Sequence, residues 1–282
     1  MLNKTYFILL PLCTALLSFA KLWQTLSPTS IVPVLQSAVH SWRLSRYKCT
    51  HGYTIEILSI DPLVMYINGF TTDFEIDHML RVSKNDFGLS YVYNERLESV
   101  IDTRYRTSQS SMIPVTDPIS QCLSTRLKSI LGNIQHIRTE PIQVVKYEPT
   151  EKFLTHMDWF DMPRNLTMKR GNTMVKRAYN RMASIFAYLD DRCTGGETYF
   201  PNVQSVSAVA DGDKFSRTES GKGLLVRPRR GNAVFWNNLF PNGTGDPRVE
   251  HAGLPVNTGI KKGINLFSYY FYDAPMFGGE EE

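Results

Sequence analysis

Phe153-Leu-Thr-His-Met-Asp-Trp-Phe160 contains a histidine two residues before a carboxylate. On a β-strand, His156 and Asp158 point to the same face, because side chains alternate with a period of two. The distant segment Val249-Glu-His-Ala-Gly-Leu-Pro-Val256 supplies a second histidine, His251. Two imidazoles and one carboxylate can hold one face of an octahedral metal ion and leave three positions open. These three residues are therefore the predicted metal ligands.

The His-x-Asp spacing alone also fits an ordinary surface pair, or a buried histidine with a carboxylate partner. The flanking segments favour the metal site. In chain order they are Gln143–Trp159, Tyr188-Leu-Asp-Asp191, Gly195-Gly-Glu-Thr-Tyr-Phe-Pro-Asn202, Gly223–Asn237, Pro241-Asn-Gly-Thr-Gly-Asp-Pro247 and Thr258-Gly-Ile-Lys-Lys262. This ordered set resembles the prolyl 4-hydroxylase family of Fe(II)/2-oxoglutarate dioxygenases. The resemblance is dense from about Gln143 to Tyr272, and it extends more weakly back to about Tyr53 through Arg106-Thr-Ser108.

The resemblance implies Fe(II), 2-oxoglutarate and O2 as cofactors, with ascorbate as the reductant. It also implies a lysine that binds the distal carboxylate of 2-oxoglutarate, since that charge would be costly to bury unpaired. Lys261 stands ten residues after His251 and matches this lysine better than Lys262 does. Three further residues match positions that line the co-substrate pocket, although each is also compatible with a packed core: Tyr147, Tyr188 and Thr198.

The substrate side departs from the family pattern. Arg181 matches the substrate-side arginine, and Trp236 is expected either in the substrate wall or in the core. The family's histidine near the end of the last strand is replaced by Tyr269, and the tryptophan two residues earlier by Phe267. The cysteine common before Pro255 is Leu254. The metal and co-substrate residues are thus intact, while the substrate surface has changed.

The predicted activity is hydroxylation of a C–H bond, most directly of peptidyl proline to 4-hydroxyproline. Two alternatives remain at this stage: a small-molecule oxidase on the same scaffold, and a non-catalytic binding module. The basic segment 161–181 is expected to be a solvated loop or a mobile lid over the metal. A net charge of +4 over 282 residues is too small to indicate a nucleic-acid partner, which leaves a peptide, a protein or a small molecule as the substrate.

The hydrophobic pattern predicts a mainly β fold with flanking helices (α+β). From Gln143 onward, short apolar or alternating runs are separated by Gly, Pro, Asn and Asp, which is typical of a β-sandwich or barrel. The expected strands are 142–147, 154–158, 183–189, 197–200, 223–226, 232–236, 249–251 and 261–271. We expect these to form the double-stranded β-helix, or jelly roll, that the family resemblance also implies.

The region before Gln143 is expected to support this core. Two strands are predicted at 55–60 and 63–67. Thr72-Asp-Phe-Glu75 has the pattern of a capping box and predicts a helix that ends near Val82. Asp117-Pro118 begins a second predicted helix, which runs to Leu131 with apolar residues at helical spacing. The helices are expected to pack against one of the two sheets.

The chain is predicted to divide into a signal peptide or signal anchor (1–23), a linker or stalk (24–50), a support region (51–141), the dioxygenase domain (142–275) and an acidic tail (276–282). Residues 6–20 are uncharged and apolar, and Ser18-Phe-Ala20 is an acceptable cleavage site. An ordinary buried helix is the alternative for this segment. A leader implies the secretory pathway, with the endoplasmic reticulum lumen as the expected location and a possible membrane anchor. Asn165-Leu-Thr is a glycosylation acceptor in that setting.

Overall fold

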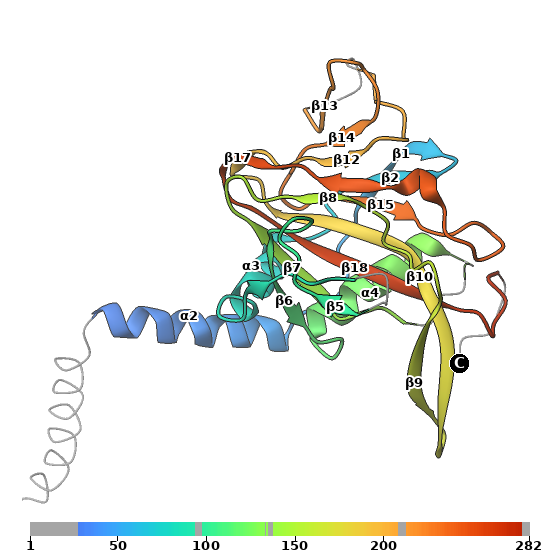
Figure 1. Cartoon of the computed structure of the whole chain (residues 1–282). Helices are drawn as coiled ribbons and strands as arrows, with labels where there is room; N and C mark the ends of the chain where they lie inside the picture. The colour runs from blue at the N-terminus through green and yellow to red at the C-terminus, as the bar shows by residue number, and fades with distance from the viewer. Residues whose placement is uncertain (1–27, 94–97, 133, 135–137, 208–212, 278–282) are drawn as a thin grey trace, which may run out of the picture. The chain divides into compact units, whose positions relative to one another are not determined.

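The computed structural model describes residues 28–93, 98–132, 134, 138–207 and 213–277 (Figure 1). The predicted leader, 1–23, and most of the acidic tail lie outside these residues. The chain divides into two units, Met1–Cys49 and Thr50–Glu282. Helix α2 (Pro28–Ser45) belongs to the first unit and lies in the predicted linker. Within the described residues, no helix is both long and apolar enough to cross a membrane.

The second unit is built on a large antiparallel sheet with the order β1-β2-β15-β10-β18-β7-β6-β3, to which β9 is added beside β10 (Figure 1). Its strands are β1 (Thr54–Ile60), β2 (Leu63–Asn68), β3 (Gly88–Leu89), β6 (Gln109–Ile113), β7 (Ile142–Tyr147), β9 (Arg164–Arg170), β10 (Thr173–Asp190), β15 (Ala233–Asn237) and β18 (Lys261–Phe271). Four of these strands come from the predicted support region, 51–141. That region is therefore an integral part of the main sheet.

A smaller sheet has the order β13-β14-β12-β16-β8. Its strands are β8 (Phe153–His156), β12 (Thr198–Phe200), β13 (Phe215–Ser216), β14 (Leu224–Val226) and β16 (His251–Gly253). Two short pairs stand apart from both sheets: β4 (Val92–Tyr93) with β5 (Ser99–Val100), and β11 (Cys193–Gly195) with β17 (Val256–Gly259). A 3-10 turn, η2 (Pro247–Val249), leads into β16.

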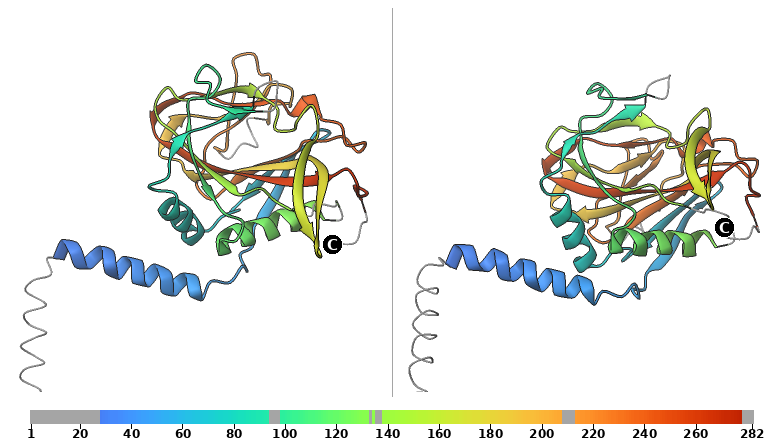
Figure 2. Two further views of the ribbon diagram at one scale, coloured as in Figure 1. Left: turned by 60° about the horizontal axis from the view of Figure 1, so that its bottom comes forward. Right: turned by 90° about the horizontal axis from the view of Figure 1, so that it is seen from below.

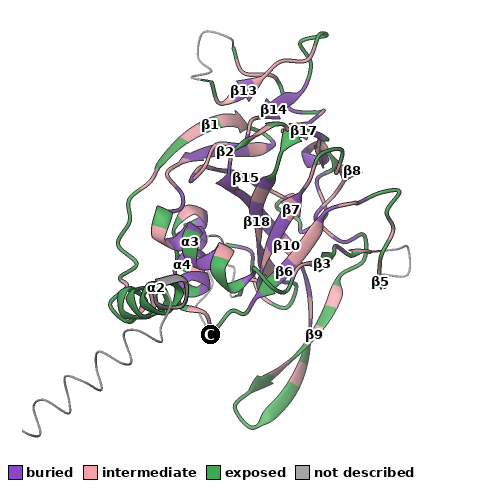
Figure 3. Ribbon diagram, turned by 90° about the vertical axis from the view of Figure 1, so that its left-hand side faces the viewer, coloured by how far each residue is buried: buried purple, intermediate pink, exposed green. Residues whose placement is uncertain are grey.

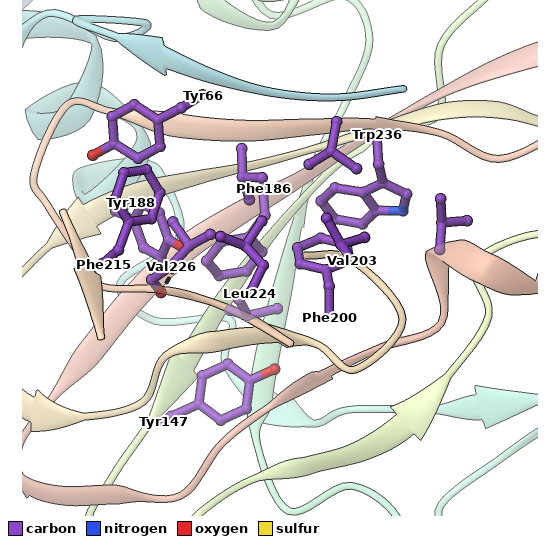
Figure 4. Packing of buried hydrophobic residues seen from close by; sticks show 14 of the residues in the cluster. Tyr66, Tyr147, Phe186, Tyr188, Phe200, Val203, Phe215, Leu224, Val226 and Trp236 are labelled. Atoms are coloured by element: carbon purple, nitrogen blue, oxygen red, sulfur yellow. Dashed lines mark hydrogen bonds between the residues drawn. The ribbon is translucent and has the colours of Figure 1, made fainter. Parts of the chain in front are cut away.

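The core lies between these two sheets (Figure 4). Tyr66 and Trp236 of the large sheet meet Phe215 and Phe200 of the small one, with ring centroids 5.5 Å and 5.3 Å apart in tilted, edge-on contacts. Such edge-to-face aromatic pairs add to the stabilisation that area burial provides. Two facing antiparallel sheets around one shared core confirm the predicted double-stranded β-helix.

Helices α3 (Asp73–Val82) and α4 (Pro118–Leu131) lie on the outside of the large sheet (Figure 2). The capping box predicted for α3 is confirmed: Thr72 accepts from the backbone N–H of Glu75, whose carboxylate accepts from the backbone N–H of Thr72. Asp117 caps α4 by accepting from the N–H groups of Ile119 and Ser120, and Pro118 opens the helix. Both helix starts therefore follow directly from local sequence.

Three predicted elements differ from the structure. The strand predicted at 154–158 ends at His156, the strand at 183–189 is the second half of the 18-residue β10, and 249–251 is the turn η2 followed by β16. The basic segment 161–181 is a β-hairpin, β9–β10, and the prediction of a loop was wrong. Figure 3 shows this hairpin extending from the sheets with mostly exposed and intermediate residues.

The hairpin forms because apolar residues alternate among its basic ones. Leu166 and Met168 on one face of β9 pack against a small cluster of Phe160, Tyr179 and Phe271. Two of the basic residues are paired with carboxylates, Arg177 with Asp273 and Arg181 with Glu140. This pattern was hidden in the sequence because basic residues dominate the segment.

The ion pair between Glu75 and Arg126 should be a major source of stability. The guanidinium bonds both carboxylate oxygens, at 2.6 and 2.8 Å, and also the carbonyl of Phe70 at 2.6 Å, with both side chains buried. Arg126→Ala leaves the buried Glu75 carboxylate without its guanidinium partner, so we expect it to lower the free energy of unfolding by about 3–5 kcal/mol in urea titrations. Arg104→Ala, which breaks an exposed pair with Asp102, is the control and should change nothing measurable. Equal effects of the two variants would contradict this assignment.

Candidate active site

The two histidines meet because their strands pair. In the small sheet, β8 and β16 are antiparallel neighbours, and His251 stands directly opposite His156. Directly opposed residues on one face have Cβ atoms about 4.5–5.5 Å apart. The imidazole centroids are 4.3 Å apart. Residues 95 positions apart in sequence thus face each other through the register of one strand pair.

Both imidazoles are held in the same tautomer. Nδ1 of His156 lies 2.8 Å from the carbonyl oxygen of Leu154, and Nδ1 of His251 lies 3.0 Å from that of Val249. A carbonyl can only accept, so each Nδ1 must carry the hydrogen. A neutral ring in this arrangement carries its lone pair on Nε2, which is the atom of each ring that faces Asp158. A backbone partner of this kind is typical of metal-binding histidines.

Asp158 completes the group from a bend just after β8. Its two carboxylate oxygens lie 3.7 Å from Nε2 of His156 and 3.7 Å from Nε2 of His251. The three ligand atoms are all within 4.8 Å of one another. Burial favours a higher pKa for Asp158, but the two histidines, Arg181 and a hydrogen bond from Ser184 outweigh it, and its pKa is lowered.

This set of donors fits a divalent transition metal. Burial lowers the pKa of His156 to about 3, with His251 acting in the same direction, so this ring is neutral at physiological pH. Two imidazoles with one carboxylate form the facial triad of non-haem Fe(II) oxygenases. The structure therefore brings together all three residues that the sequence singled out as metal ligands.

Lys261 lines the same cavity as the three predicted metal ligands. It is 2% exposed, and its Nζ is 4.7 Å from the ring centroid of Phe186 and 5.2 Å from that of Tyr147. Among the described residues, no carboxylate forms an ion pair with Lys261. A buried cation surrounded by aromatic rings needs an anionic partner, and the distal carboxylate of 2-oxoglutarate meets that need.

The remaining co-substrate candidates lie around Lys261. Tyr147 pairs with Lys261 in the register of β7 and β18, and Thr198 lines the cavity from β12. Tyr188 is fully buried, and its hydroxyl lies 2.8 Å from Oγ1 of Thr198 and donates to the carbonyl of Val226. Tyr188 is thus placed to orient the Thr198 hydroxyl from behind the cavity wall.

Arg181 is tightly bound within the protein. It donates to both oxygens of Glu140, at 2.6 and 2.8 Å, and to the backbone carbonyl of Asp158 at 3.3 Å. Its guanidinium also lies 3.8 Å from the ring centroid of Phe267. Bidentate pairing and stacking together fix an arginine in one orientation. Arg181 therefore forms part of the rigid wall beside Asp158.

The other two substrate-side candidates lie in different places. Trp236 lines the cavity and is 1% exposed, with its ring centroid 4.5 Å from that of His251. Tyr269 packs against Tyr179, with centroids 4.3 Å apart, next to the cluster beneath the hairpin. Phe267, two residues earlier on β18, does line the cavity, and the guanidinium of Arg181 lies over its ring.

The structure adds site residues that the sequence did not assign. Arg106 is buried and lines the cavity; its guanidinium lies 4.5 Å from the ring centroid of Phe153, whose ring in turn stacks 3.6 Å from that of His156. The segment Arg106-Thr-Ser108 was visible in the sequence as a family block, which was the available signal. No sequence signal marked Glu140, because its partner Arg181 is 41 residues away and joins it through tertiary packing.

Similarity to known proteins extends well beyond these residues. The sequence model of the 2OG-Fe(II) oxygenase superfamily matches residues 142–269. Probable prolyl 4-hydroxylase 4 of Arabidopsis thaliana is 31% identical over 210 residues, covering 73% of this chain and 67% of the relative. The chain belongs to the prolyl 4-hydroxylase family. Prolyl 4-hydroxylase 2 of the same plant is 30% identical over 211 residues, with 73% and 67% covered.

The fold of the family is shared as well. The 2OG complex of the viral collagen prolyl hydroxylase vCPH from Paramecium Bursaria Chlorella virus-1 superimposes with a TM-score of 0.51 at 21% identity, covering 73% of this chain and 95% of that chain. As a prolyl 4-hydroxylase family member, the protein is a 2-oxoglutarate-dependent dioxygenase. Fe(II) is its metal cofactor and 2-oxoglutarate its co-substrate, and His156, Asp158 and His251 are the residues that would hold the metal. When bound, Fe(II) and 2-oxoglutarate supply the oxidising chemistry that hydroxylates a C–H bond with O2.

Binding of 2-oxoglutarate should weaken at alkaline pH. Burial lowers the pKa of Lys261 to about 8, so the ammonium is present below pH 8 and is lost above it. We expect a flat dissociation constant below pH 8 and a rise that approaches about tenfold per pH unit above it. Calorimetric titration of the Mn(II)-loaded protein from pH 6.5 to 9.5 measures this. Lys261→Arg, whose charge persists throughout, should remove the slope. A flat wild-type profile would contradict the prediction.

Proposed function

We propose that the protein converts peptidyl proline to 4-hydroxyproline. The names of the relatives in Arabidopsis thaliana support this substrate. The observation within the site that carries it is the shape and lining of the cavity. It measures about 900 Å³, at the upper end of ordinary ligand pockets, and so has room for more than a five-carbon diacid.

The cavity has aromatic walls in addition to the rings around Lys261. Tyr91, Tyr93, Tyr105, Trp159 and Phe160 line it. Aromatic-lined grooves bind proline-rich segments, because the extended polyproline II helix is preformed and its rings pack on aromatic faces. The aromatic wall therefore suits a proline-containing peptide whose target ring reaches toward the metal ligands.

Hydrogen abstraction requires the target carbon to be held still beside the ligands. The Glu140–Arg181 pair and the Arg106–Phe153–His156 stack supply rigid walls on two sides. These groups can orient the substrate and exclude water from the reaction. Ascorbate is proposed as the reductant that keeps the iron in the ferrous state. Omitting it should slow turnover progressively in long assays.

The test is a screen of proline-rich peptides and small-molecule extracts for substrate-stimulated succinate release from 2-oxoglutarate. We expect stimulation by peptides, with a mass gain of one oxygen on proline. The His156→Ala protein is the control and should give neither signal. Stimulation by a small metabolite with no effect of any peptide would replace this proposal by the small-molecule oxidase. Ligand binding without succinate under every condition would favour a non-catalytic module.

We propose further that the protein enters the secretory pathway, with residues 1–23 as signal peptide or membrane anchor and the catalytic unit in the endoplasmic reticulum lumen. The apolar leader in the sequence supports this. Cys49 and Cys122 each take part in a disulfide, while Cys193 is free, and disulfides persist mainly in oxidising compartments. Asn165 is exposed on β9, accessible to glycosylation.

Glycosylation provides the test of location. In eukaryotic cells that express the full chain, we expect a glycosidase-sensitive mass shift. Asn165→Gln and Thr167→Ala both destroy the acceptor and should both reduce the shift. Fractionation of the same cells should place the protein in the lumen or on the luminal side of the membrane. A cytosolic, unglycosylated chain would refute the proposal.

A further inference from the structure

A chain of hydrogen bonds runs behind the metal ligand Asp158. The Oγ of Ser184 donates to Oδ2 of Asp158 at 2.6 Å, and Nδ2 of Asn238 donates to Oγ of Ser184 at 2.9 Å. Ser184 and Asn238 are fully buried, and Asp158 is 7% exposed. Charge-assisted bonds of this length to a carboxylate are among the stronger hydrogen bonds in proteins.

The direction of this chain follows from chemistry. An ionised carboxylate can only accept, so the single hydroxyl hydrogen of Ser184 must point to Asp158. Ser184 can then only accept from its other neighbour, which requires Asn238 to present its NH2 group. Among the described residues, no hydrogen bond reaches Oδ1 of Asp158. One carboxylate oxygen is therefore engaged and the other is left for a metal.

The backbone N–H and the backbone carbonyl of Asn238 both form hydrogen bonds. Its N–H donates to the carbonyl of Met182 on β10 at 2.8 Å, and its carbonyl accepts from the N–H of Asp246 at 2.9 Å. The Asp246 carboxylate caps η2, the turn that leads into His251. Asn238 thus connects the strand that carries Ser184 with the segment that carries a second metal ligand.

We propose that Ser184 and Asn238 are positioning residues that hold Asp158 with Oδ1 directed to the metal. A carboxylate that binds through one oxygen keeps three metal positions open for 2-oxoglutarate and O2, whereas rotation about its side-chain bonds would disturb that arrangement. This inference rests on the dioxygenase site and does not depend on which substrate is hydroxylated. Residues that contact metal ligands in this way typically affect metal affinity by about 10- to 100-fold.

The experiment measures metal affinity directly. Mn(II) is titrated into the metal-free protein and followed by electron paramagnetic resonance, without substrate or turnover. We expect Ser184→Ala to weaken Mn(II) binding by about 10- to 100-fold, and Ser184→Thr, which keeps a hydroxyl, to restore most of it. Asn238→Asp replaces the donor by an acceptor that competes for the Ser184 hydrogen, and it should also weaken binding.

The matched control is Ser268→Ala. Ser268 is equally buried, lies on β18 opposite Ala183, and its hydroxyl finds no hydrogen-bond partner within the described part of the chain. It should leave Mn(II) affinity unchanged, and thermal melting checks that all variants fold. A Ser184→Ala protein that folds and binds Mn(II) like wild type would overturn the proposal, as would equal losses in Ser184→Ala and Ser184→Thr. Failure of every peptide to be hydroxylated would leave this result intact.

Discussion

His156→Ala is expected to abolish 2-oxoglutarate turnover. The variant removes one of three ligand atoms that lie within 4.8 Å of one another, and the remaining pair cannot hold Fe(II) firmly at the concentrations of an assay. It also removes the ring that lies between Phe153 and His251. Succinate release should fall below detection, and the weak visible absorbance of the Fe(II)–2-oxoglutarate chelate should disappear.

The control for this variant is His51→Ala. His51 is exposed, and Nε2 makes one hydrogen bond to the carbonyl of Gly69, away from the predicted metal ligands. It should retain full turnover and iron binding. Turnover that continues in His156→Ala, or wild-type turnover that does not require Fe(II), would show that the metal site has been assigned incorrectly.

Lys261→Met is expected to raise the KM for 2-oxoglutarate on the order of 100- to 1,000-fold. Loss of one partner of a buried charge pair typically costs about 2–5 kcal/mol, because the other charge is then buried unpaired. Methionine fills nearly the same space, so the aromatic surroundings of Tyr147 and Phe186 should be preserved. Steady-state kinetics with varied 2-oxoglutarate measure the change, and metal binding alone should be unaffected.

The neighbouring lysine is a natural control. Lys262 is partly exposed and lies 3.5 Å from a carboxylate oxygen of Asp190. Lys262→Met should leave the KM for 2-oxoglutarate close to that of wild type. An equal effect of both substitutions would mean that the charge of this strand matters only through general electrostatics. A larger effect at Lys262 would transfer the co-substrate role to that residue.

The rigid binding of Arg181 bears on the departures from the family pattern. With Phe267 stacked on its guanidinium and Glu140 paired to it, this arginine has a fixed position beside Asp158. Tyr269, in place of the family's histidine, packs away toward Tyr179. Of the two altered positions on β18, Phe267 therefore contributes to the cavity wall beside Arg181, Tyr269 does not line the cavity, and the predicted metal ligands stay in place. Substrate preference is accordingly where we expect this protein to differ from its relatives.

Local sequence was sufficient for the elements whose signals are local. The capping box at Thr72–Glu75, the Asp117-Pro118 helix start and the apolar pattern of 261–271 each correspond to an observed element. The basic hairpin was missed because its alternating apolar residues are few, and the cluster that they pack against is completed by Phe271 of the distant strand β18.

For the site, the sequence alone was sufficient to predict the metal ligands and the buried lysine, because binding a particular metal and co-substrate requires particular side chains in a recurring order. Three features of the site arise only from folding. They are the pairing of His156 with His251, the Glu140–Arg181 ion pair and the chain of hydrogen bonds from Asn238 through Ser184 to Asp158. Their members are 41 to 95 residues apart in the first two pairs, and no local pattern records which buried polar groups will meet. Strand register and burial select those partners, since a polar group in the core must find a hydrogen bond with whatever the fold places beside it.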